Sequence, residues 1–476
     1  EEDWESAASF YRLALEEAPG DATLWVEYAD LLQYRLEDLE GAREALLQAE
    51  ALVPDDASID FRLAQLAIWT DRSEEAKTRL DRLLAIEDPQ LATAAPLDST
   101  RFAQATTAEM RAMLGDIHRW EGDRFASNDN YRMALAADST NPRAGEGLAE
   151  LEAEIRRDIK AAEDPGVGGT LSTLSDSDEF SNLELGAQAN DVRDDWAWSA
   201  RTGSRWIAGI GSGGLDQSER GFFLDLEGGR WWRLGTVRTG VSFGSENTRP
   251  QGTDFSFGAS LVATDLSGFR ADLAFAHGPA YPLTVTLQSM LARTMQDRLT
   301  ATLVRAMTER WSLVMVADGA WLDAKDTGGQ ETEGSLRLEG ALSLERRLVS
   351  GLSVGATGRV MGYSNPSPVV DGIRLFWDPS ALYSAGVYAG WSREVRPEWS
   401  LRARFQPSLA WIDERQQVGF ELVPHLSAEA GFTHTGSRFR TGLDVFYYQG
   451  RFDGYRAYGL RMTFSAIDWL GRRRAR

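Results

Sequence analysis

The hydrophobic pattern of this chain changes its period near residue 165, and no other feature restricts the possible folds as strongly. Before this point apolar residues recur at helical spacing; after it, apolar and polar residues alternate between regularly spaced turns. Successive side chains of a strand point to opposite faces, so the alternation predicts strands. The clearest stretch, 333–345, places Glu333, Ser335, Arg337, Glu339, Ser343 and Glu345 on one face and Leu336, Leu338, Leu342 and Leu344 on the other.

A sheet of this kind can place its apolar face in two environments. In a water-soluble sandwich that face points into a protein core, whereas in a transmembrane barrel it points to lipid and the polar face lines a lumen. No apolar run reaches the roughly 18–20 residues of a membrane-spanning helix. Only a barrel could therefore place this chain in a membrane. Its 476 residues predict two or more domains.

Composition excludes several kinds of site. The chain has no cysteine, so disulfides and thiolate metal sites are excluded. Residues 1–165 hold 37 acidic and 17 basic residues, a net charge of −20, whereas 166–476 hold 35 and 33, a net charge of −2. This balance argues against nucleic-acid binding, which needs a basic face. The acidic part suits a solvated helix surface or a domain with a cationic partner.

The first 160 residues contain an internal repeat. Related residues recur with a period of roughly 34, with small residues where paired helices would touch and proline after the second helix. The four sets are Trp4, Ala7, Tyr11, Ala14 and Pro19; Trp25, Ala42, Leu46, Ala49 and Pro54; Leu63, Ala64, Ala76, Leu80 and Pro89; and, after an insertion around 90–107, Leu114, Gly115, Tyr131 and Ala134. This pattern resembles the tetratricopeptide repeat family.

The resemblance implies helix pairs that stack because one repeat alone cannot bury its apolar face. Such a stack usually binds a peptide or protein on its concave surface, although a simple spacer is the alternative. The chain starts with Glu1, lacks a signal peptide and opens inside the second helix of a repeat. We therefore expect a processed or trimmed product with further repeats upstream, and draw no argument for the cytoplasm. Asp164, Pro165 and Gly166 break the last helix.

The pattern after residue 165 predicts sixteen antiparallel strands, an even number as in single-chain bacterial barrels. Segment 281–296 fits either a strand or a short loop helix. The predicted strands are 167–176, 180–190, 196–210, 219–230, 236–246, 254–264, 269–277, 298–307, 311–322, 333–346, 351–362, 381–393, 398–411, 419–432, 437–449 and 454–464.

Two further observations favour a transmembrane barrel. Connections after even-numbered strands are short, as at 308–310 and 433–436, whereas those after odd-numbered strands are often longer, as at 278–297 and 363–380. Short periplasmic turns and long outer loops produce this alternation, which places both chain ends in the periplasm. Tryptophans gather near predicted strand ends, as at membrane interfaces; they are Trp196, Trp231, Trp232, Trp311, Trp321, Trp391, Trp399 and Trp411.

Sixteen strands predict an aqueous channel rather than a filled core. Acids and bases both occur on the predicted inner face, which suits a neutral or mixed-charge solute; alternatively, these charges only pair with each other and keep the wall hydrated. The candidate lumen residues are Asp225, Glu227, Arg238, Arg270, Asp272, Glu333, Arg337, Glu339, Glu345, Arg402, Arg404, Glu421, His425, Glu429, Arg438, Arg440, Asp444 and Arg461.

One short segment adds a second resemblance. Leu375-Phe376-Trp377-Asp378-Pro379-Ser380, with Tyr383 shortly after it, is similar to an aromatic-Asp-Pro element of outer-membrane exopolysaccharide exporters, which include cellulose and poly-N-acetylglucosamine exporters. Helical repeats followed by a sixteen-strand barrel match the architecture of that group. The resemblance implies passage of a polysaccharide through the barrel and docking of periplasmic or envelope proteins on the repeats.

We therefore predict an α+β protein of two domains, an α-solenoid of tetratricopeptide repeats (1–165, periplasmic) and a sixteen-strand antiparallel barrel in the bacterial outer membrane (166–470). Two alternatives stay open: a barrel that anchors a periplasmic scaffold and has a plugged channel, and a porin for small solutes. No nucleophile elbow, phosphate loop or zinc spacing occurs, and Ser427 beside His425 is a chance-level pair. We expect no enzyme activity, cofactor or metal.

Overall fold

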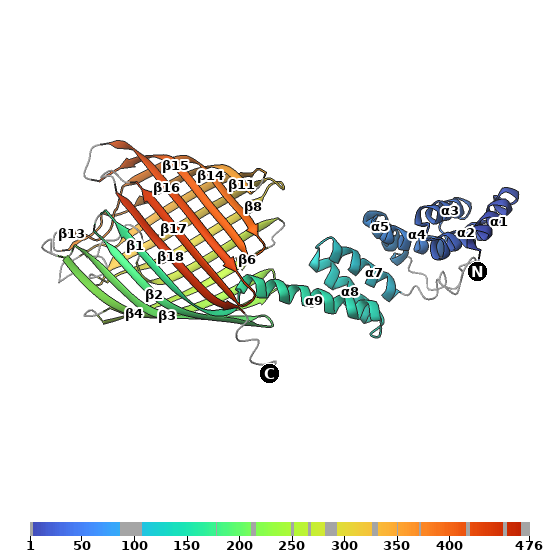
Figure 1. Ribbon diagram of the computed structural model, residues 1–476, viewed down its shortest axis with the longest axis horizontal. Coiled ribbons are helices and arrows are strands. Elements are labelled where there is room, and N and C mark those ends of the chain that lie inside the picture. The colour runs from blue at the N-terminus through green and yellow to red at the C-terminus, as the bar shows by residue number, and fades with distance from the viewer. Residues whose placement is uncertain are drawn as a thin grey trace. The chain divides into compact units, whose positions relative to one another are not determined.

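The computed structural model describes residues 3–85, 107–177, 179–210, 216–248, 252–264, 268–280, 293–325, 332–349, 351–370, 373–415, 419–450 and 455–467. The chain forms two compact units, Glu1–Ile155 and Arg156–Arg476. The first is helical and the second is a barrel (Figure 1). The predicted insertion around 90–107 and most of segment 281–296 lie outside the described residues.

Eight helices occur in the described part of the chain, and the last of them crosses the boundary between the two units. None of the described helices is both long and apolar enough to cross a membrane. The helices are α1 (Trp4–Glu17), α2 (Ala22–Arg35), α3 (Leu39–Leu52), α4 (Ala57–Trp69), α5 (Ser73–Leu84), α7 (Thr107–Trp120), α8 (Arg124–Ala137) and α9 (Pro142–Glu163).

An aspartate starts most of these helices. The side chain of the residue before the helix accepts a hydrogen bond from a backbone N–H of the first turn, which otherwise has no partner within the helix. Asp3, Asp21, Asp38, Asp56 and Asp123 act in this way for α1, α2, α3, α4 and α8. Five acidic residues of the repeats therefore have a local structural role as helix caps.

The residues that define the sequence repeat form the core of the helical unit. Ala42, Leu46 and Ala49 of α3 are almost completely buried, as are Ala76 and Leu80 of α5. Full burial of one leucine side chain contributes roughly 1.5–3 kcal/mol. The alanines let helices approach closely while the leucines supply apolar area, as the repeat predicts.

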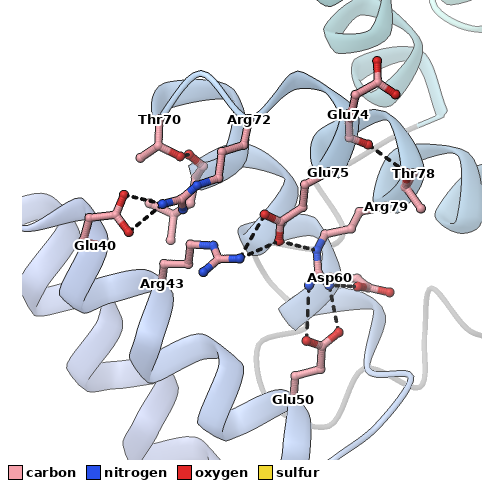
Figure 2. A network of polar contacts seen from close by, with 11 residues as sticks. Glu40, Arg43, Glu50, Asp60, Thr70, Arg72, Glu74, Glu75, Thr78 and Arg79 are labelled. Carbon is pink, nitrogen blue, oxygen red and sulfur yellow. Dashed lines mark hydrogen bonds and ion pairs between the residues drawn. The ribbon is translucent and has the colours of Figure 1, made fainter.

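Ion pairs link successive repeats at a regular spacing. Arg43 of α3 pairs with Glu75 of α5 at 3.0 Å, and Glu40 pairs with Arg72 at 2.6 Å, so each pair joins residues 32 apart. Figure 2 shows Arg79 of α5 between acidic side chains, 2.8 Å from Glu50 and 2.6 Å from Asp60. The hydrogen bond from Arg79 lowers the pKa of Glu50. These pairs set the register of α5 against α3 and α4.

Sixteen antiparallel strands in the described residues close into one barrel, as predicted. The short strands β12 (Val369–Val370) and β13 (Ile373–Arg374) form a separate two-stranded sheet. The barrel strands are β1 (Gly166–Asp176), β2 (Ser181–Arg193), β3 (Trp196–Ile210), β4 (Asp216–Trp232), β5 (Val237–Thr248), β6 (Gly252–Ala263), β7 (Phe269–Pro279), β8 (Thr294–Ala306), β9 (Trp311–Ala324), β10 (Ser335–Arg347), β11 (Leu352–Tyr363), β14 (Ala381–Arg396), β15 (Trp399–Asp413), β16 (Phe420–Thr435), β17 (Phe439–Gln449) and β18 (Arg456–Ile467).

The two ends of the barrel carry different connections. We call the end where β1 starts and β18 stops the near end, and the opposite one the far end. Near-end turns run from two residues (194–195) to five (264–268), whereas the far end includes the long connections 325–334 and 364–380. The predicted alternation of turn lengths is therefore present.

Pairing of β1 with β18 closes the barrel. Their register runs from Gly166 opposite Ile467 to Asp176 opposite Ala457. A Cβ atom at Gly168 would lie 2.1 Å from the carbonyl oxygen of Phe464, so only glycine allows the two backbones to approach this closely. The strand β18 continues beyond Phe464 to Ile467, further than the predicted end at 464.

The packing of Tyr131 gives a first prediction. Its ring is fully buried between α7 and α9, where a Cβ atom added at Gly115 would lie 2.6 Å from the ring. We expect Gly115→Ala to lower the free energy of unfolding of the helical unit by about 1–3 kcal/mol, because the ring has no room to shift. Gly145→Ala is the matched control, since its Cβ would meet nothing within 4 Å. Thermal unfolding followed by circular dichroism at 222 nm compares them; equal effects would contradict this account.

The hydroxyl of Tyr131 gives a second prediction. It donates to Asp116 at 2.6 Å, and burial, followed by this hydrogen bond, raises the pKa of the phenol above its usual range. The pKa of the phenol is higher in the folded protein than in the unfolded chain, where it is about 10. The phenol therefore makes its full contribution to stability below pH 10, and this contribution is lost as the pH rises further. The helical signal should therefore fall above pH 10.

The variant Tyr131→Phe is the control for this prediction. It keeps the ring but cannot ionise, and Asp116 retains its 2.8 Å ion pair with Arg143. We expect the variant to start less stable and to show a flatter loss of helical signal between pH 10 and 12. The same alkaline slope in both proteins would show that other groups control it.

Candidate functional site

Ion pairs that skip a strand identify the inner face of the barrel. One terminal nitrogen of Arg205 on β3 donates to both carboxylate oxygens of Glu246 on β5, at 2.9 and 3.0 Å, across β4. Arg402 on β15 pairs with Asp444 on β17 across β16. Curvature brings alternate strands together only on the concave side, so these polar side chains point inward.

The opposite face is apolar and exposed. Phe243 and Phe255 stack on neighbouring strands with ring centroids 6.0 Å apart, yet about half of each side chain is accessible. Val387 and Phe405 are exposed in the same way. A closed barrel with a polar inside and an apolar outside is the transmembrane type, because its outer face has lipid as its solvent. The barrel is therefore that of an outer-membrane protein.

Tryptophans on this outer face agree with the predicted interfacial belt, with one exception. Trp196, Trp232 and Trp411 are each more than 40% exposed. Trp231 points inward instead and is only 6% exposed, so its predicted place at the lipid interface is wrong. The reason is parity, because adjacent residues of a strand face opposite sides and only Trp232 can meet lipid.

The strand registers place the predicted lumen residues on the inner face. Glu333 and Arg438 lie just outside β10 and β17, and all the others are in strands. Whether they line an open channel stays a prediction. Those within strands are Asp225, Glu227, Arg238, Arg270, Asp272, Arg337, Glu339, Glu345, Arg402, Arg404, Glu421, His425, Glu429, Arg440, Asp444 and Arg461.

A cavity of about 1020 Å³ lies inside the barrel and contacts the inner wall from β1 to β3 and from β11 through β18. Arg402, Arg404, Glu429, Asp444 and Arg461 belong to its lining. The guanidinium of Arg404 lies over the Tyr388 ring at 4.0 Å, and the Tyr388 hydroxyl donates to Glu345 at 3.1 Å. The structure therefore brings together predicted residues from five strands.

The same cavity includes charged residues that the sequence analysis missed. Glu184 accepts hydrogen bonds from both Arg201 and Arg205, the second at 2.9 Å. The two guanidiniums lie over the inward-facing ring of Phe223, at 4.8 and 5.6 Å from its centroid. The alternation of Glu184 with Leu183 and Leu185 was a usable signal. Phe223 gave no such signal, since an apolar residue in these strands normally indicates the outer face.

A buried carboxylate organises another part of the wall. Asp318 on β9 is 5% exposed and accepts from Arg298 at 2.6 Å, from Thr300 at 2.7 Å and from Arg337. Glu339 pairs with Arg359 at 2.8 Å on the adjacent strands. Most acids of the inner wall thus have a basic neighbour within ion-pair distance.

One sector of the interior is apolar, unlike the polar wall that was predicted. The described residues of connection 364–380 fold into the far end, where Leu375 and Phe376 are almost fully buried. They share a hydrophobic cluster with inward-facing residues of β9, β11, β14, β15 and β16, among them Leu322, Met361 and Ile412. The Phe376 ring stacks on Tyr363 at 5.6 Å. The aromatic-Asp-Pro element noted in the sequence therefore packs against the inner wall of the barrel.

The near end has its own polar cluster. Trp231 and Arg238 both donate to one carboxylate oxygen of Glu163, at 2.8 and 2.6 Å, and Arg238 also pairs with Glu227 at 2.9 Å. Asp164 pairs with Arg440 on β17. These contacts tie the segment before β1 to the inner rim, which accounts for the inward position of Trp231.

No group of His, Asp or Glu side chains suited to a metal ion occurs among the described residues. His277 faces outward and stacks on Phe257 at 4.7 Å, whereas His425 faces inward, edge-on to Tyr448 at 6.0 Å. The inner wall thus offers charge pairs, hydroxyls and aromatic rings as its chemistry.

No family model matches this sequence, and no curated protein matches it. Solved structures resemble its two parts separately. A structure titled bacterial polysaccharide outer membrane secretin is 11% identical and covers 64% of this chain and 99% of its own, with a TM-score of 0.48. Pseudomonas aeruginosa OccK10 (OpdN), 11% identical, covers 63% and 97%, with a TM-score of 0.33.

The helical part is similar to MamA protein, which is 16% identical and covers 34% of this chain and 78% of its own, with a TM-score of 0.27. The tetratricopeptide protein YrrB, 17% identical, covers 32% and 71%, with a TM-score of 0.24. Identities this low transfer no substrate or partner to this chain.

The Asp318 cluster gives a prediction for the barrel. Removing its charge with Asp318→Asn leaves Arg337, which is 8% exposed, without a carboxylate at this site. We expect a loss of roughly 3 kcal/mol in barrel stability, because an uncompensated buried charge is costly. The temperature at which the folded, fast-migrating form is lost on an electrophoresis gel measures this.

Asp272→Asn is the matched control for this prediction. Asp272 pairs with Arg270, which is more than half exposed. Exposed pairs contribute about 0–1 kcal/mol, so this variant should unfold almost like the parent protein. Equal losses in the two variants would contradict the special role of Asp318.

Proposed function

We propose that this protein is an outer-membrane channel that exports a secreted polysaccharide, with its helical repeats in the periplasm. One observation carries the proposal. A barrel with a polar inner face and an apolar outer face encloses a cavity of about 1020 Å³, and acidic and basic side chains of its lining lie close to each other. Paired charges attract neither polyanions nor polycations strongly over a distance, and their remaining hydrogen-bonding groups suit a hydroxyl-rich solute. The resemblance of segment 375–380 to exopolysaccharide exporters supports the same substrate class.

The short turns at the near end support the orientation. Short turns are periplasmic and long loops are external in bacterial outer-membrane barrels. Both β1 and the end of β18 lie at this near end, so the helical repeats would start on the periplasmic side. In this proposed orientation, the repeats would meet the polymer and its processing enzymes in the periplasm.

Exposed aromatic side chains favour a docking role for the repeats. Tyr34, Trp69 and Trp120 lie in the last turns of α2, α4 and α7 and are 48%, 48% and 57% exposed. The rings of Tyr34 and Trp69 meet edge to face at 6.5 Å. Large aromatic residues left in water at equivalent places often mark protein interfaces. We propose that periplasmic or envelope proteins bind the helical unit there.

A second function has one observation in its favour. The apolar sector formed by connection 364–380 occupies part of the far end, as a plug would. A barrel blocked in this way would serve as an anchor for a periplasmic scaffold. A porin for small solutes is the third alternative.

Single-channel conductance in planar bilayers distinguishes these functions. We expect stable conductance that one class of neutral or weakly charged oligosaccharide blocks, while oligosaccharides of other classes serve as controls. A folded barrel without conductance would favour the anchor, and conductance without block by any glycan would favour the small-solute porin.

A further inference from the structure

The connection between β11 and β14 contributes a folded element to the barrel interior. We call its described residues, 364–370 and 373–380, the insert. Val370, Leu375 and Phe376 of the insert are at most 5% exposed and belong to a cluster with inward-facing residues of the wall. The small sheet of β12 and β13 lies within the insert. The insert is therefore packed against the inner wall through a shared apolar cluster.

A completely buried carboxylate holds the insert together. Asp378 is 0% exposed; it pairs with Arg374 at 2.7 Å and accepts the backbone N–H of Ser367 at 2.6 Å. Ser367 in turn accepts the backbone N–H of Phe376 at 3.0 Å through its hydroxyl. Both ends of the insert are therefore joined through one aspartate.

The same region is tied to the next far-end connection. Arg415, between β15 and β16, lies 3.7 Å from the Asp378 carboxylate, and its Nε donates to the Asp378 backbone carbonyl at 3.2 Å. It also donates to the carbonyl of Tyr363, where β11 ends. The indole of Trp377 donates to Glu414 at 2.6 Å. Polar contacts thus join the insert to the β15–β16 connection and to the end of its own strand β11.

We infer that the insert is a fixed constriction that sets the size limit of the channel, and that Asp378 is the residue that positions it. The inference rests on the proposed conduit and adds the element that limits what passes. Two guanidiniums and a backbone amide meet at the Asp378 carboxylate. Removing this negative charge leaves the partly buried guanidiniums without this counter-charge, which is unfavourable. Without the Asp378 charge, the insert keeps its apolar burial and the hydrogen bond from Trp377 to Glu414 but loses the ion pairs that join its two ends.

The first test measures the size limit directly. Conductance of the full chain is recorded with neutral polyethylene glycols of graded size, for the parent protein, Asp378→Asn and the control Asp60→Asn, which alters a buried carboxylate of the helical unit that pairs with Arg79. We expect Asp378→Asn to conduct more and to admit larger polymers, while Asp60→Asn keeps the parent size limit. An unchanged size limit in Asp378→Asn would overturn the inference.

The second test does not depend on conductance. The chain has no cysteine, so one introduced thiol is the single labelling site. Ala410 on β15 belongs to the cluster and is 0% exposed, between the register partners Ser384 and Val423. Ala410→Cys should react slowly with a water-soluble maleimide, and adding Asp378→Asn should raise its rate about tenfold or more, because local opening exposes it.

Ala274→Cys is the control, because Ala274 is an exposed residue of the inner wall on β7. Its labelling should be fast with or without Asp378→Asn, and electrophoretic mobility of the unheated protein verifies that each barrel has folded. Equal labelling of Ala410→Cys in both backgrounds would overturn the role of Asp378. Faster labelling in a barrel that never conducts would support that role and count against the proposed export function alone.

Discussion

Everything in this barrel depends on the pairing of its first strand with its last. In a bilayer, a sheet edge would leave rows of N–H and C=O groups without partners, at a cost of several kcal/mol each. The pairing of β1 with β18 removes that edge, and Gly168 allows the close approach it needs. Closure also fixes which face is concave. Because the polar side of every strand faces the concave interior, the polar residues pair with one another there.

Concentration of charge in the interior has consequences for packing. Pairs such as Arg205 with Glu246 reach across an intervening strand, so they connect parts of the wall that the backbone ladder does not join directly. Two more deeply buried carboxylates act locally: Asp318 joins β9 to its neighbours β8 and β10, and Asp378 joins the two ends of the insert. Several donors around each carboxylate offset the desolvation cost of burying its charge. The interior is thus held by polar contacts where it is open and by apolar contacts where the insert covers it.

The helical unit has the opposite distribution of residues, with apolar side chains in its core and charged side chains on its surface. Alanines and leucines at repeat positions give each helix pair a core, and ion pairs such as Arg43 with Glu75 align one repeat with the next. Part of the excess of acidic residues caps helices or takes part in these ion pairs. The exposed rings of Tyr34, Trp69 and Trp120 lie outside this core, where the proposed partner would contact them.

The sequence alone determined the change of architecture near residue 165, the sixteen strands and the inward or outward side of most residues, because both periods are local properties of the chain. It misplaced Trp231 because two adjacent tryptophans at a strand end both suit the membrane interface, and it gave no signal for Phe223, an apolar residue in the middle of β4 that faces inward. Nor could it show that 364–380 folds back inside the barrel. The contacts of Asp378 and of Glu163 join residues far apart in the chain, so only the tertiary structure brings them together.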